Sequence, residues 1–198
     1  VRRGGVRELR ETILRQGQCV GDSIVKVDMF LNHRLDTRLM FAMGRELADY
    51  FGNDKPDIVL TVEASGIALA LAAAHFLDDI PVVFAKKSPA ANQSADMLTA
   101  VAHSFTHGND NALRVDRRYL PAGSRVLVVD DFLADGEASR ALISIVEQAG
   151  CTLVGVGIAV EKGFQPGGRK LREAGVNLKS LAIVTSIQDG RIQLADDD

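Results

Sequence analysis

The chain has 198 residues, of which 46% are hydrophobic and 25% charged, and its formal net charge is -3. This length and composition suit one globular domain with a sizeable core. The slightly acidic balance gives no general attraction for nucleic acid, so we expect no nucleic-acid partner, and any phosphate ligand must be held locally. The two cysteines, Cys19 and Cys151, form no CxxC pair, which is typical of a reducing compartment and predicts a cytoplasmic protein.

Charges interrupt the N-terminal segment "VRRGGVRELRETILRQG" at almost every turn, so we expect no signal peptide there. The longest apolar run, Ile67 to Leu77, is too short for a bilayer and rich in alanine. Such a run is typical of a helix packed on a sheet. The sequence therefore predicts no membrane partner.

Apolar residues at helical spacing predict a first helix over 6–15 and a second that begins after Asp36 as its N-cap. The β-branched stretch "IVLTVEA" predicts a buried strand, followed by a helix over 65–79 and another strand over 80–87. Residues 88–111 are polar, small and weakly periodic. They predict a long mobile loop with a strand at its far side.

In the second half, "SRVLVVDD" predicts a strand, "EASRALISIVEQAG" a helix and "CTLVGVGIAVEK" a further strand. The buried face of that helix is expected to carry Ala138, Leu142, Ile145, Val146 and Ala149. A tail with "FQPGG", a short helix and a last strand near "SLAIVTSI" closes the chain. This alternation predicts an α/β fold with a parallel sheet, helices on both faces, and a ligand site at the carboxyl ends of the strands.

Two adjacent acids, Asp130 and Asp131, stand at the predicted end of the strand in "VLVVDDFLADGEAS". Backbone N–H groups of the loop that follows, aided by the helix dipole, can hold a phosphate without lysine. Carboxylates would repel a polyphosphate, so they better suit neutral donors such as vicinal sugar hydroxyls. The stretch therefore predicts a cradle for a ribose 5-phosphate.

Other readings of these motifs are weaker. The sequence has no GxxxxGK[ST] motif, and its GxG lies inside a predicted strand, which disfavours a P-loop hydrolase and a dinucleotide site. The two acids could instead merely cap a helix. His103 and His107 have the helical spacing of metal ligands, but strand-favouring neighbours and the lack of a third ligand argue against a metal bound by the protein.

The stretch "VLVVDDFLADG" resembles the phosphoribosyl-diphosphate signature of type I phosphoribosyltransferases. Further segments resemble the bacterial xanthine phosphoribosyltransferases, namely "KVDMFLNHRLD", "EASGIALA", "VVFAKK", "SFT" and "EKGFQPG". The likeness covers most of the chain. It implies the α/β type I phosphoribosyltransferase fold in a single domain over 1–198, with a small hood formed by N-terminal and C-terminal segments, about 18–35 and 162–198.

The resemblance implies a reaction in purine salvage. The 5-phosphoribosyl group of phosphoribosyl diphosphate would pass to xanthine, giving xanthosine 5'-monophosphate and diphosphate. Mg²⁺ would travel with the diphosphate and not occupy a site ligated by the protein. The resemblance also implies a homodimer with residues 88–111 near the partner subunit, and we expect that segment to close over the substrates and exclude water.

The resemblance also assigns roles to residues around the sugar and the leaving group. Asp130 and Asp131 would bind the ribose hydroxyls, and Lys86 and Lys87 would offer positive charge to the departing diphosphate, where negative charge develops. Backbone amides would wrap the 5-phosphate at Ala134, Asp135, Gly136, Glu137 and Ala138. Another turn would present amides to the diphosphate at Ala64, Ser65 and Gly66.

By the same resemblance, the purine would contact Val25, Asn32, Lys162 and Phe164. Lys162 can donate to a 6-oxo group, which an adenine amino group would reject, and Asn32 can read the 2-position. Residue type alone does not separate xanthine from guanine. Plainer alternatives stay open: Lys162, Lys86 and Lys87 as solvated lysines, Asn32 as a helix cap, and Phe164 as a packing residue of the tail.

The sequence departs from the superfamily pattern in the phosphate loop, where Asp135 and Glu137 add two acids beside a dianionic phosphate. Unless both side chains point away, like-charge repulsion would weaken phosphate binding. Two alternative functions remain: a guanine or hypoxanthine phosphoribosyltransferase, and a non-catalytic regulator that binds phosphoribosyl diphosphate. A regulator would need a DNA-binding module and a basic surface, and the chain is acidic.

Overall fold

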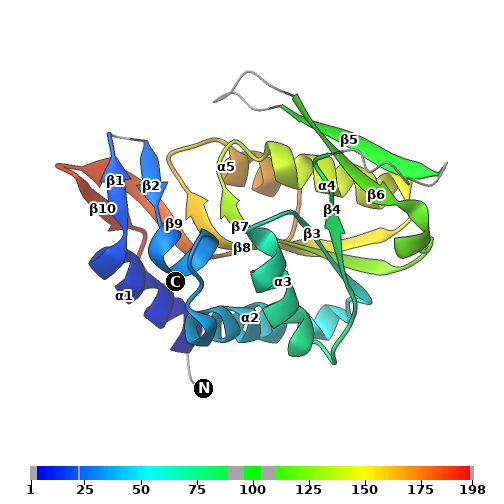
Figure 1. The fold of residues 1–198 in the computed structure, drawn as a ribbon, viewed down its shortest axis with the longest axis horizontal. Helices are drawn as coiled ribbons and strands as arrows, with labels where there is room; N and C mark the ends of the chain where they lie inside the picture. The colour runs from blue at the N-terminus through cyan, green and yellow to red at the C-terminus, as the bar shows by residue number, and fades with distance from the viewer. Residues whose placement is uncertain (1–3, 22, 89–95, 104–109, 197–198) are drawn as a thin grey trace.

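The computed structural model describes residues 4–21, 23–88, 96–103 and 110–196. Its centre is a six-stranded sheet in the order β10-β9-β8-β7-β3-β4 (Figure 1). The strands are β3 (Ile58–Val62), β4 (Val82–Ala85), β7 (Arg125–Leu133), β8 (Thr152–Lys162), β9 (Leu178–Gln188) and β10 (Arg191–Leu194). All neighbours pair in parallel except β10, which is antiparallel to β9. The predicted α/β fold with a parallel sheet is therefore confirmed.

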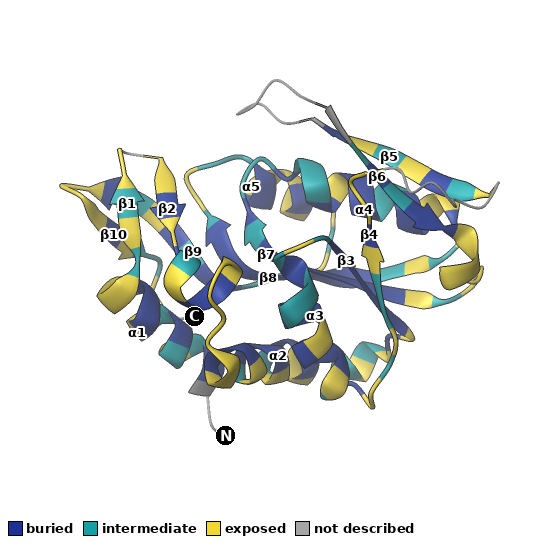
Figure 2. Ribbon diagram, in the orientation of Figure 1, coloured by how far each residue is buried: buried dark blue, intermediate teal, exposed yellow. Residues whose placement is uncertain are grey.

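Helices cover both faces of this sheet (Figure 1). One face carries α1 (Gly4–Gln16), α2 (Thr37–Phe51) and α3 (Gly66–His75), and the other carries α4 (Glu137–Gln148) and α5 (Gly167–Glu173). Side chains of β7 alternate between two hydrophobic clusters, with Leu127 and Val129 in one and Val126 and Val128 in the other. The central strands β3, β7 and β8 are thus buried on both sides (Figure 2), which explains their continuous apolar runs.

The predicted helices form at the positions that the periodicity of apolar residues indicated. Asp36 caps α2, because its Oδ1 accepts the N–H of Leu39 at 3.1 Å. The alternative that Asn32 caps this helix is therefore wrong. On α4 the expected buried face is confirmed for Leu142, Ile145, Val146 and Ala149, whereas Ala138 is half-buried.

The prediction of a long loop over 88–111 is wrong in part. β5 (Met97–His103) and β6 (Asp110–Asp116) form an antiparallel ribbon that runs beside α4. Leu98 and Leu113 are buried against the α4 side of the sheet. Because the other inward positions of β5 are alanines, the apolar alternation is too weak to reveal the strand. The segments 89–95 and 104–109, with "SFT" and His107, lie outside the described residues.

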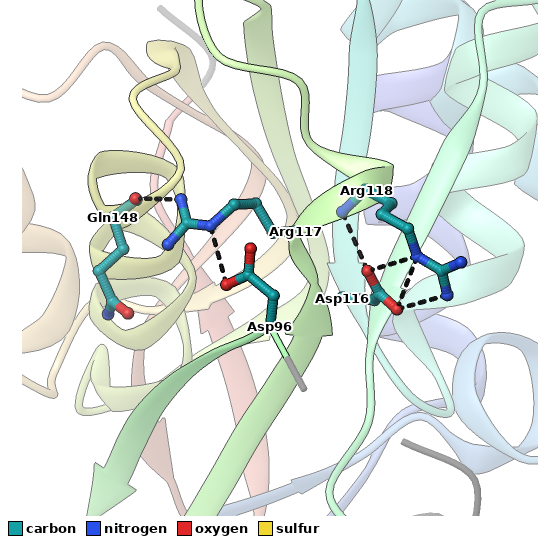
Figure 3. A network of polar contacts seen from close by, with 5 residues as sticks. All are labelled: Asp96, Asp116, Arg117, Arg118 and Gln148. Atoms are coloured by element: carbon teal, nitrogen blue, oxygen red, sulfur yellow. Dashed lines mark hydrogen bonds and ion pairs between the residues drawn. The ribbon is translucent and has the colours of Figure 1, made fainter. Parts of the chain in front are cut away.

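A polar network ties the base of this ribbon to α4 (Figure 3). Arg117 lies in the short helix η3 (Arg117–Tyr119) and donates from Nε to Oδ1 of Asp96 at 3.1 Å and from Nη1 to the carbonyl of Gln148 at 2.8 Å. The side chain of Gln148 in turn donates from Nε2 to the carbonyl of Thr99 in β5 at 3.1 Å. The adjacent Arg118 stays local and forms a bidentate pair with Asp116.

Several short elements were not predicted. These are the antiparallel pair β1 (Gln18–Val20) and β2 (Ile24–Lys26), the π-helix η1 (Asp28–Asn32), the 3₁₀ helix η2 (Gly52–Asp54), η3 and β10. Segments of three to five residues such as β1, β2 and η1 are too short for periodicity to show. Within the described ranges, no helix combines the length and apolar character that crossing a membrane requires.

Candidate active site

A cavity of about 280 Å³ opens at the carboxyl ends of β3 and β7, where an open parallel sheet binds its ligands. Its walls come from these two strand ends, from the β5–β6 ribbon and from the loop that leads into α4. The lining residues are Val62, Glu63, Ser65, Lys87, Ala102, Leu113 and residues 130–139. The fold therefore brings the predicted ribose, 5-phosphate and diphosphate positions to one place.

Asp130 and Asp131 are both buried in the wall of this cavity. The N–H of Asp131 donates to Oδ1 of Asp130 at 2.9 Å. Burial, and next the adjacent charge of Asp131, raise the pKa of the Asp130 carboxyl well above its usual range, and Lys87 acts in the opposite direction. Such a pair can accept hydrogen bonds from hydroxyl groups, and its protonated member can also donate one.

The loop after the acids forms a wall of the cavity from Ala134 to Ala138. Gly136 occupies the N-cap of α4 with φ +84°, in the left-handed region that glycine adopts without strain. A glycine has no side chain that could cap the first-turn N–H groups of this helix. These N–H groups and the helix dipole therefore suit an anion such as a phosphate monoester.

Each acid of this loop has a cationic neighbour. Glu137 pairs with Arg140 one turn along α4. The carboxylate of Asp135 raises the pKa of Lys162, against the larger opposing effect of burial. The expected repulsion between these acids and a phosphate is thus partly neutralised by charges that only the fold brings near.

The turn between β3 and α3 holds Ala64, Ser65 and Gly66. Ser65 lines the cavity, and the peptide bond before Ala64 is cis. A Cβ at Gly66 would collide with the buried hydroxyl of Thr61 and lie 2.8 Å from Oδ1 of Asp130. The turn can therefore lie this close to Asp130 only because residue 66 is glycine.

The two lysines after β4 differ in position. Lys87 lines the cavity, and its N–H donates to Oε1 of Glu63 at 2.6 Å. Arg114 Nη1 donates to the Lys87 carbonyl at 3.0 Å. Lys86 is exposed and absent from the cavity wall, and its backbone pairs with that of Arg114 in the ribbon. Both lysines are exposed, and of the two Lys87 contributes to the cavity wall whereas Lys86 does not.

Lys162 stands at the end of β8, half-buried, with Nζ 5.8 Å from the centroid of the Phe132 ring. Burial lowers its pKa. Val25 is buried in β2, whereas Asn32 and Phe164 are exposed. None of these four expected purine contacts lines the cavity itself.

Phe132, Glu63 and Ser139 also line the cavity, and the sequence reasoning gave them no role. β7 continues through the two acids to Leu133 instead of ending at them. Phe132 packs against the cluster of Leu127 and Val129, whereas Leu133 belongs to the cluster of Val126 and Val128. The alternation of β7 therefore breaks at the acids, and a period of two does not indicate the position of Phe132. The parts played by Glu63 and Ser139 depend on contacts between distant segments and have no local signal.

The family model described as "Phosphoribosyl transferase domain" matches residues 29–188 of this chain. The xanthine phosphoribosyltransferase 1 of Clostridium perfringens is 45% identical over 184 residues, which are 93% of this chain and 97% of that protein. The xanthine phosphoribosyltransferase of Bifidobacterium animalis subsp. lactis is 48% identical over 92% of this chain and 94% of that protein.

Among solved structures, the adenine phosphoribosyltransferase of Rhodothermus marinus superimposes with a TM-score of 0.73, covering 91% of this chain and 98% of that one. At 22% identity this likeness supports the fold alone. It confirms the fold class that the acid-pair signature implied. Because relatives at 45% and 48% identity align over nearly their whole length, the chain belongs to the phosphoribosyltransferase family, among the bacterial xanthine phosphoribosyltransferases.

Proposed function

We propose that this chain transfers the 5-phosphoribosyl group of phosphoribosyl diphosphate to xanthine, giving xanthosine 5'-monophosphate and diphosphate in purine salvage. The observation that carries the proposal is one cavity in which the buried acid pair Asp130 and Asp131 lies beside the glycine-capped start of α4. The relatives named for xanthine support the choice of base.

The sugar is held at two points in this proposal. Asp130 and Asp131 accept hydrogen bonds from the ribose hydroxyls, and the amides of residues 134–138 bind the 5-phosphate. With both ends of the ribose phosphate fixed, the anomeric carbon lies between the leaving diphosphate and the incoming base. This orientation lowers the entropic part of the barrier.

Negative charge moves onto the diphosphate as its bond to the anomeric carbon breaks. The amides of residues 64–66 and the ammonium of Lys87, with Lys86 on the exposed side, stabilise that charge in the transition state. In the described part of the chain no three His, Cys, Asp or Glu side chains cluster as metal ligands. Carboxylates such as those of the acid pair suit the water shell of Mg²⁺, and we propose that the ion arrives on the diphosphate and neutralises part of its charge.

The base is proposed to lie against Phe132 under a hood formed by about 18–35 and 162–198. Lys162, near that ring, donates to the 6-oxo group, and Asn32 reads the 2-position. The full set of proposed purine contacts is Val25, Asn32, Lys162 and Phe164. A donor lysine at the 6-position selects against adenine, because an amino group cannot accept its proton.

We further propose a cytoplasmic homodimer. Cys19 and Cys151 are free thiols, which fits a reducing compartment. Leu71 of α3 is 62% exposed and Phe84 of the edge strand β4 is 40% exposed, so this side offers apolar surface to a second copy. Size-exclusion chromatography with light scattering measures the mass, and a monomer would remove this part of the proposal.

The first test is a spectrophotometric assay with phosphoribosyl diphosphate and Mg²⁺ in which xanthine, guanine, hypoxanthine and adenine are offered separately. The proposal expects the highest kcat/KM with xanthine. A clear preference for guanine or hypoxanthine would replace the substrate while leaving the reaction in place. Saturable binding of phosphoribosyl diphosphate without turnover of any base would favour a regulator.

Replacement of an acid tests the ribose assignment. Asp131→Ala removes an acceptor for a ribose hydroxyl, and we expect kcat/KM to fall roughly 10-fold to 150-fold, since a bond to a charged group contributes about 1.5–3 kcal/mol. Asp49→Ala, an exposed acid on α2, is the matched control and should leave the rate unchanged. Retained turnover in a folded Asp131→Ala enzyme would rule out the ribose assignment.

A further inference from the structure

Glu161 is a buried carboxylate with no part in the steps proposed above. It lies at the end of β8, directly before Lys162, and is only 3% exposed. Arg172 of α5 donates to it twice, from Nη1 to Oε1 at 2.7 Å and from Nη2 to Oε2 at 2.8 Å. Ser180 of β9 donates its hydroxyl to Oε2. A bidentate charged pair of this kind fixes the relative position of the elements that carry it.

The pair holds α5 tightly against β8. Gly168 lies where the helix crosses the carboxylate, and a Cβ there would collide with Oε1 of Glu161 and lie 2.7 Å from Nη1 of Arg172. Residue 168 must therefore be glycine for Arg172 to reach the carboxylate from the next turn of α5. The length of α5 is only seven residues, so its placement depends on such tertiary contacts.

The first residue of α5 in turn supports the phosphate loop. The N–H of Gly167 donates to the carbonyl of Ala134 at 3.0 Å. A Cβ at Gly167 would collide with this carbonyl and lie 2.6 Å from the Gly136 nitrogen, and a Cβ at Gly136 would lie 3.1 Å from Cα of Gly167. The helix start and the loop are thus in direct backbone contact, and a shift of one displaces the other.

We propose that Glu161 and Arg172 are positioning residues that set the phosphate loop through α5. The ion pair anchors α5 to β8, and α5 fixes the loop amides around Gly136 through Gly167. The same pair also steadies Lys162, which follows Glu161 and whose carbonyl accepts the N–H of Gln165 at 2.8 Å. This inference rests on the proposed function, because that function assigns the 5-phosphate to the loop and the base to Lys162.

The test is Arg172→Met, which keeps the aliphatic stem and removes both hydrogen bonds. We expect KM for phosphoribosyl diphosphate to rise on the order of tenfold and KM for xanthine to rise as well, because displaced binding groups lose affinity steeply with distance. The dissociation constant of phosphoribosyl diphosphate, from calorimetry without a base, should rise by the same factor. Arg169→Met is the matched control, since Arg169 lies on the same helix and pairs only at the surface with Glu173, at 3.4 Å. It should change none of these constants more than about twofold.

A second variant separates a loss of positioning from a loss of folding. Arg172→Met alone leaves a buried unpaired charge, which can unfold the protein, whereas Glu161→Gln/Arg172→Met removes both charges. We expect the folded double variant, checked by its melting temperature, to show the same weakened binding of phosphoribosyl diphosphate. A double variant with wild-type affinity, whether or not its melting temperature falls, would overturn the positioning role.

The two proposals fail in different ways. A wild-type enzyme that binds phosphoribosyl diphosphate but transfers it to no purine would defeat the proposed function, and the affinities of the variants would still decide the role of the ion pair. Normal xanthine turnover together with unchanged affinity in both variants would leave the function standing and overturn the positioning role.

Discussion

Among single residues, Asp130 lowers the stability of the folded protein at neutral pH, because its ionised carboxyl would be buried. Burial, and next the charge of Asp131, raise the pKa of its carboxyl above the usual value near 4. The folded state therefore holds this proton more tightly than the unfolded state does. Consequently, the stability gained from the protonated carboxyl is present at low pH and is lost as the pH rises from about 4 through the folded-state pKa.

Asp130→Asn tests how much the buried charge of Asp130 destabilises the folded state. The amide has almost the same shape without the charge, so we expect the melting temperature at neutral pH to rise by roughly 2–4 °C for each ~1 kcal/mol of relieved charge burial, while activity falls at least about tenfold. Melting curves of both proteins between pH 4 and 8 measure the effect. The difference should grow with pH. Parallel curves over this range would show that the carboxyl of Asp130 does not carry the cost.

The pKa of Lys162 offers a second test. Burial lowers this pKa and the carboxylate of Asp135 partly restores it, so Asp135→Asn should lower it further. We expect the alkaline limb of kcat/KM for xanthine, at saturating phosphoribosyl diphosphate, to move to lower pH. Glu137→Gln is the matched control because Glu137 pairs with Arg140. An alkaline limb that stays in place in Asp135→Asn would contradict the role of Lys162 as a proton-bearing donor.

At the scale of elements, the sequence predicted the long helices and the sheet strands well and the β5–β6 ribbon poorly. The helices α2 and α4 have full apolar faces and clear starts, at Asp36 and after the glycine loop. β5 has mostly alanine at its inward positions, so its strand character comes from pairing with β6 and packing on α4. Strand pairing in a ribbon depends on contacts between two segments. The periodicity of one segment alone therefore does not predict it.

Arg117 and Gln148 both join this ribbon to α4, and Arg117 makes two of the hydrogen bonds at the junction (Figure 3). Arg117→Ala removes two hydrogen bonds that contribute about 0.5–1.5 kcal/mol each, so we expect amide hydrogen exchange in β5 and β6 to accelerate roughly fivefold to 150-fold. Exchange in β7 and β8 should not change. Arg118→Ala is the matched control, because Arg118 donates to Asp116 at the end of the ribbon itself. Equal acceleration in both variants would show that the bridge to α4 is not what holds the ribbon.

At the scale of the whole molecule, the two hydrophobic clusters share a single sheet. Leu47 of α2 belongs to one cluster and Leu142 of α4 to the other, and both are fully buried. Since β7 contributes side chains to both clusters, loss of either one removes support from the other. We therefore propose that residues 1–198 unfold as one cooperative domain.

Leu47→Ala and Leu142→Ala test this coupling. Each removes a buried leucine at a cost of about 2–5 kcal/mol, which lowers the melting temperature by roughly 2–4 °C per ~1 kcal/mol in a protein of this size. We expect each variant to show one calorimetric transition, shifted as a whole. Two separate transitions, with only one shifted by each substitution, would show that the clusters unfold independently.

Local periodicity, turn residues and contiguous motifs were enough to predict the parallel α/β fold, the acid pair on its strand and the glycine loop that precedes the next helix. Only the tertiary structure decided that Lys87 and not Lys86 lines the cavity and that Arg140 and Lys162 lie near the acids of the loop. It also brought Arg172 to Glu161 and the start of α5 to the carbonyl of Ala134. Burial, pairing of charges and close backbone approach depend on segments far apart in the chain, and no local pattern encodes which of them meet.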